Sequence, residues 1–228
     1  MVFLMIVTGI DGCRGGWIAV SLSTDDVRVR TAGTLDGLDI QGVTGIDMPL
    51  GLLADGWRTA DALARQALGG RGASVFAIPP RPVWAAPDYA TANLRCRELT
   101  GRGMSAQAWG LRTRLLEADG FRRARSLSDS PPDPPREVHP ELSFAALAGA
   151  PLTDSKHGPA GLAVRRALLD GAGIVLPPRV AGAAEHDLLD AAAVAWSARR
   201  IAAGTACVLP GAPHTQLSDD GFEITVSY

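Results

Sequence analysis

Cysteine is scarce in this chain of 228 residues. Its three cysteines, Cys13, Cys96 and Cys207, are odd in number and widely spaced, which excludes a disulfide framework and a Cys-x-x-Cys metal site. Apolar runs are short as well, and none approaches the roughly 18 residues that a membrane span requires. The first residues, MVFLMIVTGID, lack a basic segment and a small-residue cleavage site, so they predict a strand and not a signal peptide. We therefore expect a cytoplasmic protein with no membrane partner.

Lysine is almost absent, since Lys156 is the only lysine among 22 basic residues. Residues 57–136 hold 13 arginines against 7 acidic residues, whereas the remainder of the chain is acidic on balance. A basic middle in an acidic body indicates an anionic partner such as nucleic acid, or arginines that only coat exposed helix faces. In the first case the residues facing the partner would be Arg58, Arg71, Arg81, Arg95, Arg97 and Arg102.

Hydrophobic periodicity predicts an α/β fold. Residues 5–11 are nearly all apolar, as in a strand buried on both faces, while 16–23 and 27–33 predict an antiparallel hairpin. Further strands are expected at 43–47, 136–141 and 221–228, and helices at 59–70, 88–99, 105–125, from 142, at 160–170 and at 185–204. A hairpin followed by crossover-linked strands indicates a mixed sheet with helices on its faces.

The pentapeptide Val-Thr-Gly-Ile-Asp occurs twice, ending at Asp11 and at Asp47. If the two segments form neighbouring parallel strands, about 4.8 Å apart, the aspartates stand side by side at the carboxyl edge of the sheet. Two bare carboxylates so close would repel each other unless a cation lay between them. The repeat therefore predicts two halves of one metal site.

A second pair of acids, Asp187 and Asp190, begins the apolar segment HDLLDAAAVAW and shares one face of the expected helix. Capping of the helix N-terminus would explain Asp187, and it explains Asp190 less well. The pair is thus predicted to complete the metal site, with capping as the alternative.

Several segments together carry a resemblance to a known family. They are GIDGCRGGW, IDMPLGL, GASVFAIPPR, EVHPELSF, SKHGPAGLAVRR and HDLLDAAAVAW. This set is similar, along nearly the whole chain, to a bacterial family of unknown function whose members are described as predicted RNase H-like nucleases. More distantly, the first and last segments resemble RuvC-type resolvases. Those enzymes have glutamate where this chain has Asp47, and residues 57–135 have no RuvC counterpart in detail.

The resemblance implies a single RNase H-like domain over residues 1–228, with a five-stranded sheet in the order 3-2-1-4-5. Residues 57–135 would then be a helical, arginine-rich insertion. It further implies carboxylates on the first strand, the fourth strand and the last helix, which are Asp11, Asp47, Asp187 and Asp190. Such a site hydrolyses phosphodiester bonds with two Mg²⁺ or Mn²⁺ ions, since hard cations take oxygen ligands.

Further candidates lie near these acids in the predicted fold. Glu137 and His139 alternate onto one face of a short strand and could supply an outer-shell acid and a proton carrier, while His139 and Glu141 could instead cap the next helix. Lys156 could contact a phosphate as a compact point charge.

Two other classes of function compete with a nuclease. One is a non-catalytic module that binds nucleic acid or another ligand on the same fold. The other is an actin-like phosphotransferase, which needs a duplicated domain that 228 residues do not hold. The chain has no Walker A motif, no Ser-His-Asp elbow and no zinc-ligand spacing.

Overall fold

The computed structural model describes residues 6–24, 26–126 and 134–228. Its centre is a five-stranded mixed sheet in the order β3-β2-β1-β4-β5, which confirms the predicted fold class and strand order. The strands are β1 (Val7–Cys13), β2 (Gly16–Leu22), β3 (Val27–Ala32), β4 (Val43–Ile46) and β5 (Arg136–Glu137). β1, β2 and β3 are antiparallel neighbours, whereas β4 and β5 continue the sheet in parallel from β1.

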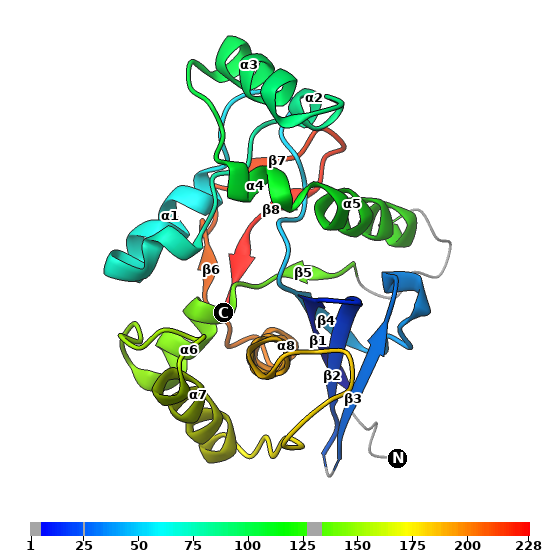
Figure 1. The fold of residues 1–228 in the computed structure, drawn as a ribbon, viewed down its shortest axis with the longest axis vertical. Coiled ribbons are helices and arrows are strands. Elements are labelled where there is room, and N and C mark those ends of the chain that lie inside the picture. Colours follow the sequence, from blue (N-terminus) through cyan, green and yellow to red (C-terminus); the bar gives the residue numbers. More distant parts are fainter. Residues whose placement is uncertain (1–5, 25, 127–133) are drawn as a thin grey trace.

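The described helices between β4 and β5 form the upper part of Figure 1. They are α1 (Thr59–Leu68), η2 (Gly69–Ser74), α2 (Arg81–Trp84), α3 (Tyr89–Thr100), α4 (Ala106–Gly110) and α5 (Arg112–Ser126). A separate 3-10 turn, η1 (Leu35–Gly37), lies between β3 and β4. One continuous helix was predicted at 105–125, and the structure instead breaks it at Leu111. Gly110, which weakens a helix interior, directly precedes the break. Residues 127–133 of the predicted insertion lie outside the described residues.

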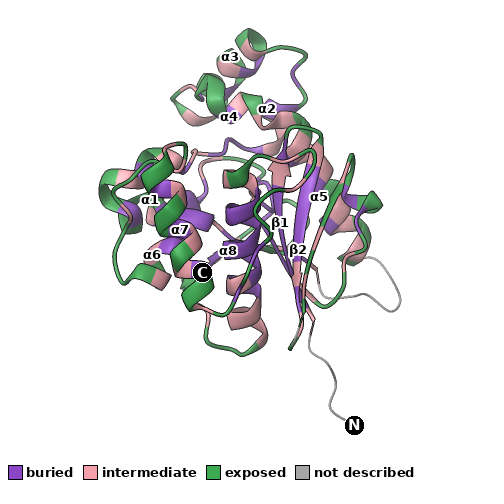
Figure 2. Ribbon diagram, turned by 60° about the horizontal axis from the view of Figure 1, so that its bottom comes forward, coloured by how far each residue is buried: buried purple, intermediate pink, exposed green. Residues whose placement is uncertain are grey.

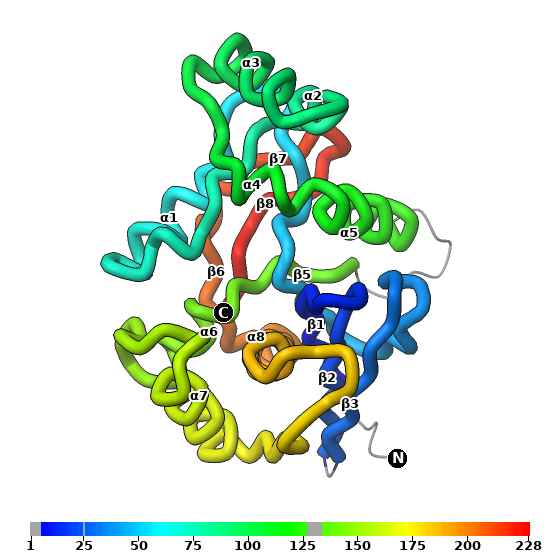
Figure 3. The backbone as a smooth tube through the Cα atoms, in the orientation of Figure 1, coloured from blue at the N-terminus to red at the C-terminus, as the bar shows by residue number. Residues whose placement is uncertain are grey.

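The remaining elements are α6 (Pro140–Ala148), α7 (Pro159–Gly171), α8 (Glu185–Ala202), β6 (Val208–Leu209), β7 (Gln216–Leu217), β8 (Glu223–Ile224) and β9 (Val226–Ser227). The strand predicted to run to residue 141 ends at Glu137, because Pro140 occupies the first turn of α6, where a missing N–H costs nothing. The predicted last strand is two short strands, and β9 pairs with β6. Figure 3 shows this terminal segment running beside β6 and ending near α6.

Two helical layers cover the sheet. α8 packs on one face, against β1, β2 and β4, with α6 and α7 behind it. Figure 2 shows α8 largely buried beside the strands. On the other face, Ile10 and Ile46 pack with Leu115 and Ala118 of α5. No helix in the described part of the chain is long and apolar enough to cross a membrane.

Candidate metal centre

The repeated pentapeptide forms the predicted pair of adjacent parallel strands. Val7 of β1 lies opposite Val43 of β4, and the register continues residue by residue to Ile10 and Ile46. The Asp47 N–H donates to the Ile10 carbonyl oxygen at 2.8 Å, which extends the pairing by one step beyond β4. The carboxylates of both repeats therefore emerge at the same point of the sheet edge.

The glycine of each repeat explains how α8 reaches that edge. Side chains alternate along a strand, so Gly9 and Asp11 face the same side of the sheet, as do Gly45 and Asp47. A Cβ on Gly9 would lie 2.0 Å from the Ala195 backbone nitrogen. The backbone of α8 thus rests directly on the sheet, and this close approach brings the helix N-terminus over the aspartates.

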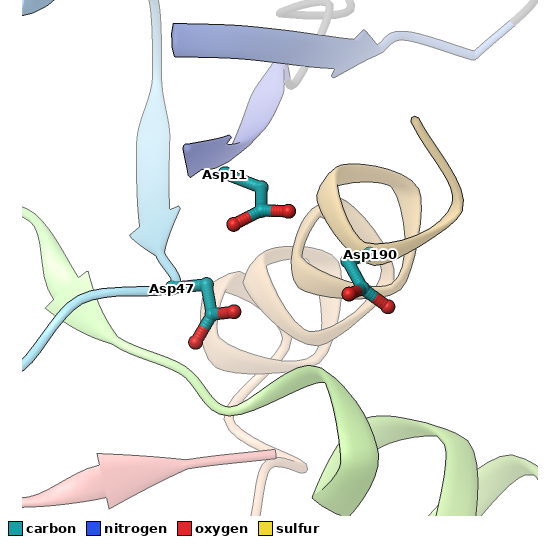
Figure 4. Close-up of side chains that lie close together, drawn as sticks. All are labelled: Asp11, Asp47 and Asp190. Carbon is teal, nitrogen blue, oxygen red and sulfur yellow. The ribbon is translucent and has the colours of Figure 1, made fainter. Parts of the chain in front are cut away.

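Three carboxylates meet there: Asp11, Asp47 and Asp190 each offer one oxygen atom, and these atoms lie within 4.8 Å of one another. Figure 4 shows them converging from β1, the end of β4 and α8. Asp11 is 8% exposed and Asp190 is fully buried. Asp11 Oδ1 accepts the Gly12 N–H at 2.7 Å, whereas the buried Asp190 Oδ1 has no hydrogen-bond partner among the described residues.

The environment disfavours negative charge on all three acids. Burial, followed by repulsion from Asp47 and Asp190, raises the pKa of Asp11 well above its usual range. Burial raises the pKa of Asp47 to about 7 although Lys156 opposes this effect. The pKa of Asp190 is also raised, chiefly by burial. Groups that are this hard to ionise without a cation are the groups that a metal ion would stabilise.

The site fits a divalent metal ion. Its donors are hard carboxylate oxygens, which suit Mg²⁺ or Mn²⁺, and Asp190 Oδ1 is a buried acceptor left without a protein donor. A buried acceptor without a hydrogen-bond partner destabilises the fold, and a bound ion would supply the missing partner. Asp11, Asp47 and Asp190 are the residues that would hold the ion.

Lys156 is the cation nearest to this group. Its Nζ lies 2.5 Å from Asp190 Oδ2, and its side chain is 31% exposed. Burial disfavours the ammonium charge, but Asp190, Asp47 and Asp11 together raise the pKa of Lys156 above its usual range. The lysine stays charged and partly neutralises the acids.

Asp187, the fourth predicted ligand, lies outside the group of three. Its Oδ2 accepts the N–H of Ala184, the N-cap residue of α8, at 3.0 Å. Its Oδ1 lies 3.2 Å from His186 Nε2. Asp187 thus makes the contact expected of a helix cap, which was the alternative prediction. Asp190, in contrast, lies with Asp11 and Asp47.

Glu137 and Glu141 are buried and His139 is half-buried, and most of their polar atoms have partners. Glu137 accepts the Leu50 N–H at 2.7 Å and pairs with Arg58, yet burial raises its pKa to about 7. The pKa of His139 is lowered by burial, and its Nε2 lies 3.4 Å from the Ser74 carbonyl oxygen. His139 makes no side-chain cap for α6, so its capping role is not seen.

Both carboxylate oxygens of the buried Glu141 accept from Nη2 of Arg165, at 2.7 and 2.9 Å, and Oε1 lies 3.4 Å from Arg71. Glu141 therefore forms an ion pair and does not cap α6, contrary to the alternative prediction. The cavity beside the aspartates is nevertheless lined by Glu137, His139 and Glu141.

That cavity has a volume of about 520 Å³. Asp11 and Asp47 form part of its wall, with Lys156 and His157 on one loop, Arg71 from η2 and Arg114 from α5. Arg114 lies against Gly12 and donates to the Cys13 carbonyl oxygen. These contacts hold its guanidinium beside the two residues that follow Asp11. The cavity thus combines carboxylates with three cationic side chains.

The arginines predicted to face an anionic partner fall into different environments. Arg58 is buried between Glu137 and Asp61, so it is not available to a partner and that part of the prediction is wrong. Arg81 pairs with Asp119 at 2.7 Å and with Asp219. Arg95, Arg97 and Arg102 are exposed, and Arg71 lines the cavity.

A family model matches residues 9–215 of this chain, and its description is protein of unknown function (DUF429). The chain belongs to this family. The match spans all three carboxylates, Lys156 and most of the cavity wall. No curated protein and no solved structure matches the chain significantly.

Two contributors to this DUF429 site were not predicted from the sequence. Arg114 was counted only in the basic balance, and its position in the cavity depends on how α5 packs over β1. The glycines of the pentapeptide were noted only as part of the repeat. Their recurrence at equivalent positions, two residues before each aspartate, was the available signal for a helix that crosses both strands.

Proposed function

We propose that this protein is a divalent-metal-dependent hydrolase of phosphodiester bonds in nucleic acid. The observation that carries the proposal is the meeting of Asp11, Asp47 and Asp190 beside a cavity whose wall holds the first two of them together with cationic side chains. Carboxylates alone would suit many cation sites. Their combination with Lys156, Arg71 and Arg114 suits a substrate that is itself anionic.

The acids and the cations divide the work. Asp11, Asp47 and Asp190 hold Mg²⁺ or Mn²⁺, which, when bound, polarises a phosphoryl oxygen and lowers the pKa of water. Lys156 and Arg114 provide fixed positive charge for the non-bridging phosphate oxygens, whose charge grows in the transition state. Because these side chains are held by protein contacts before the substrate arrives, little reorganisation is needed.

The size of the cavity favours an unpaired strand over a duplex. A volume of about 520 Å³ is in the range of pockets that enclose a small molecule. One or two nucleotides of a single strand would therefore enter, and a duplex would have to present a frayed end or a branch. The same observation supports a free nucleotide as a second candidate substrate.

The structure has free thiols at Cys13, Cys96 and Cys207, which suits a reducing compartment. We place the activity in the cytoplasm, where nucleic acids and millimolar Mg²⁺ meet.

A cleavage assay on a panel of substrates tests the proposal. The panel holds single-stranded, double-stranded and branched DNA, RNA, free nucleotides and bis(p-nitrophenyl) phosphate, each with Mg²⁺, Mn²⁺ or EDTA. We expect metal-dependent cleavage of unpaired strands that is lost in Asp11→Asn. The matched control is Asp39→Asn, an exposed acid beside Gln41, which should cleave like the parent.

The outcomes separate the competing functions. Binding of oligonucleotides without cleavage under any metal would replace the hydrolase with a non-catalytic binding module. Cleavage that survives Asp11→Asn would place the chemistry outside this centre.

A further inference from the structure

The contact between Lys156 and Asp190 has a bearing on how many metal ions the centre holds. The sequence resemblance implies two ions. In the structure, Asp190 Oδ2 is already taken by Lys156 Nζ, at 2.5 Å, and only Oδ1 remains without a protein partner. We propose that Lys156 supplies the positive charge of a second ion, so that the three carboxylates hold one divalent cation per chain.

The charges of the centre support a single ion. Asp11, Asp47 and Asp190 carry three negative charges when ionised, and Lys156 cancels one of them. One divalent cation then brings the centre to neutrality. A second would leave a net charge of plus two at a site where the protein itself provides no further carboxylate within the 4.8 Å group of the described residues.

The geometry of the donors points the same way. Each of the three acids offers one oxygen, and these three atoms lie within 4.8 Å of one another. Asp187, which could have widened the donor set, uses one oxygen on the Ala184 N–H and has the other beside His186. Among the described residues, the donor set is therefore limited to the three acids.

Lys156 is built into the fold and is not a chance surface cation. Nη1 of the fully buried Arg165 donates to the Asp154 and Gly161 carbonyl oxygens, both at 3.1 Å. Its Nη2 donates to the Glu141 carboxylate. A Cβ on Gly161 would lie 2.0 Å from the Ser155 carbonyl oxygen, so the loop rests directly on α7. These contacts hold the backbone on both sides of Lys156 in place.

A lysine suits this position better than an arginine. Its ammonium group is a compact point charge on a flexible stem, comparable in shape to an ion, whereas a guanidinium is a planar fork. The inference rests on the proposed function, because a fixed positive charge beside the ion would act by stabilising the negative charge of a bound phosphate.

The test counts metal ions directly. Isothermal titration with Mn²⁺, checked by the electron paramagnetic resonance signal of free Mn²⁺, is carried out on the parent, Lys156→Met, Lys156→Arg and Arg28→Met. The first substitution removes the charge and keeps the length of the side chain. Arg28→Met removes one charge at the exposed hairpin, where Arg28 pairs with Asp26. Circular dichroism melts confirm that each variant is folded.

We expect one ion per parent chain. Lys156→Met should bind a second ion, or bind the first at least about tenfold more tightly, since a like charge at this range changes a binding equilibrium by about one to three orders of magnitude. Lys156→Arg keeps the positive charge and should still bind one ion, and Arg28→Met should bind as the parent does.

Two ions in the parent would overturn the inference, as would unchanged Mn²⁺ binding in Lys156→Met or the same change in Lys156→Arg. The proposed function is judged separately by cleavage. Two ions with cleavage would refute only the role of Lys156, and one ion with the expected response but no cleavage on any substrate would refute only the hydrolase. A parent that binds no Mn²⁺ would overturn both.

Discussion

Gly9 and Gly45 lie opposite each other in the parallel register of β1 and β4, and α8 passes over both. A Cβ on Gly9 would meet the Ala195 nitrogen at 2.0 Å, and one on Gly45 would meet the Val194 side chain at 2.9 Å. The two positions therefore set the distance between the sheet and the helix that carries Asp190. Assembly of the carboxylate centre depends on this pair, although neither glycine touches the cavity.

Gly9→Ala should destabilise the protein by about 3 kcal/mol or more, because the added methyl group meets backbone atoms that cannot rotate away. Urea unfolding measures the free energy of unfolding. The control is Gly15→Ala, where nothing lies within 4 Å of an added Cβ. Equal stability of the two variants would show that α8 can move off the strands without cost.

Asp11→Asn should raise the free energy of unfolding in EDTA by at least about 1 kcal/mol, because it removes a buried charge that Asp47 and Asp190 repel. Asparagine keeps an oxygen that can accept the Gly12 N–H. The stabilisation that Mn²⁺ gives the parent should disappear. Thermal melts with and without metal measure both effects, and a variant that unfolds in EDTA would mean that the acid is structural.

Asp47 should make both stability and metal binding depend on pH. Its pKa rises from 3.8 to about 7, so the folded protein keeps a proton that the unfolded chain has released. Without metal, the contribution of Asp47 to stability therefore falls as the pH rises from about 4 to about 7 and is constant above that range. Mg²⁺ needs the ionised form, so the rise in melting temperature caused by Mg²⁺ should grow over the same range.

The measurement is a set of melts between about pH 5 and 8 on the parent and Asp47→Asn. Subtracting the two profiles removes the groups whose pKa does not depend on Asp47, including Glu137, whose pKa is also raised to about 7. Parallel profiles in EDTA would contradict the role given to Asp47.

Arg165→Met should cost about 3–5 kcal/mol, because it leaves the buried Glu141 without its ion-pair partner. The neighbouring substitution Arg166→Met breaks an ion pair with the exposed Glu185 and should cost about 0–1 kcal/mol. Chemical unfolding of the two variants gives the comparison. A small loss in Arg165→Met would show that Arg71 or water can replace the missing partner.

Binding of single-stranded oligonucleotides should weaken steeply between about 50 and 200 mM salt, since each phosphate contact releases counterions. Arg71→Ala and Arg114→Ala should each reduce the slope of the salt dependence by about 1. Arg95→Ala tests whether the exposed face of α3 takes part, and Arg28→Ala serves as the remote control. Fluorescence anisotropy at several salt concentrations measures the slopes. Binding that does not depend on salt would mean that these arginines do not contact phosphate groups.

Local pattern was sufficient for the first four strands, the main helices and the most informative feature of the site. The apolar runs that end in Asp11 and Asp47 specify buried strands whatever surrounds them, and two copies of one pentapeptide favour equivalent positions in neighbouring strands. The parallel register then brings both carboxylates to one edge, and the alternation of side chains puts them on one face. The Ala- and Leu-rich segment that becomes α8 is equally independent of its context.

Only the tertiary structure decided which charges meet at the candidate metal centre. Asp187 and Asp190 look alike in the sequence, but the first lies in the first turn, where free N–H groups attract it, and the second lies above the sheet. The basic stretch likewise includes the internal partner Arg58.

The contact of Lys156 with Asp190 joins residues 34 positions apart, and that of Arg114 with Cys13 joins residues 101 apart. Periodicity and composition report which residues are buried or helical, because these depend on neighbours in the chain. They do not report which charge lies opposite which, because burial of an ion is tolerated only with a partner that the packing of distant elements supplies.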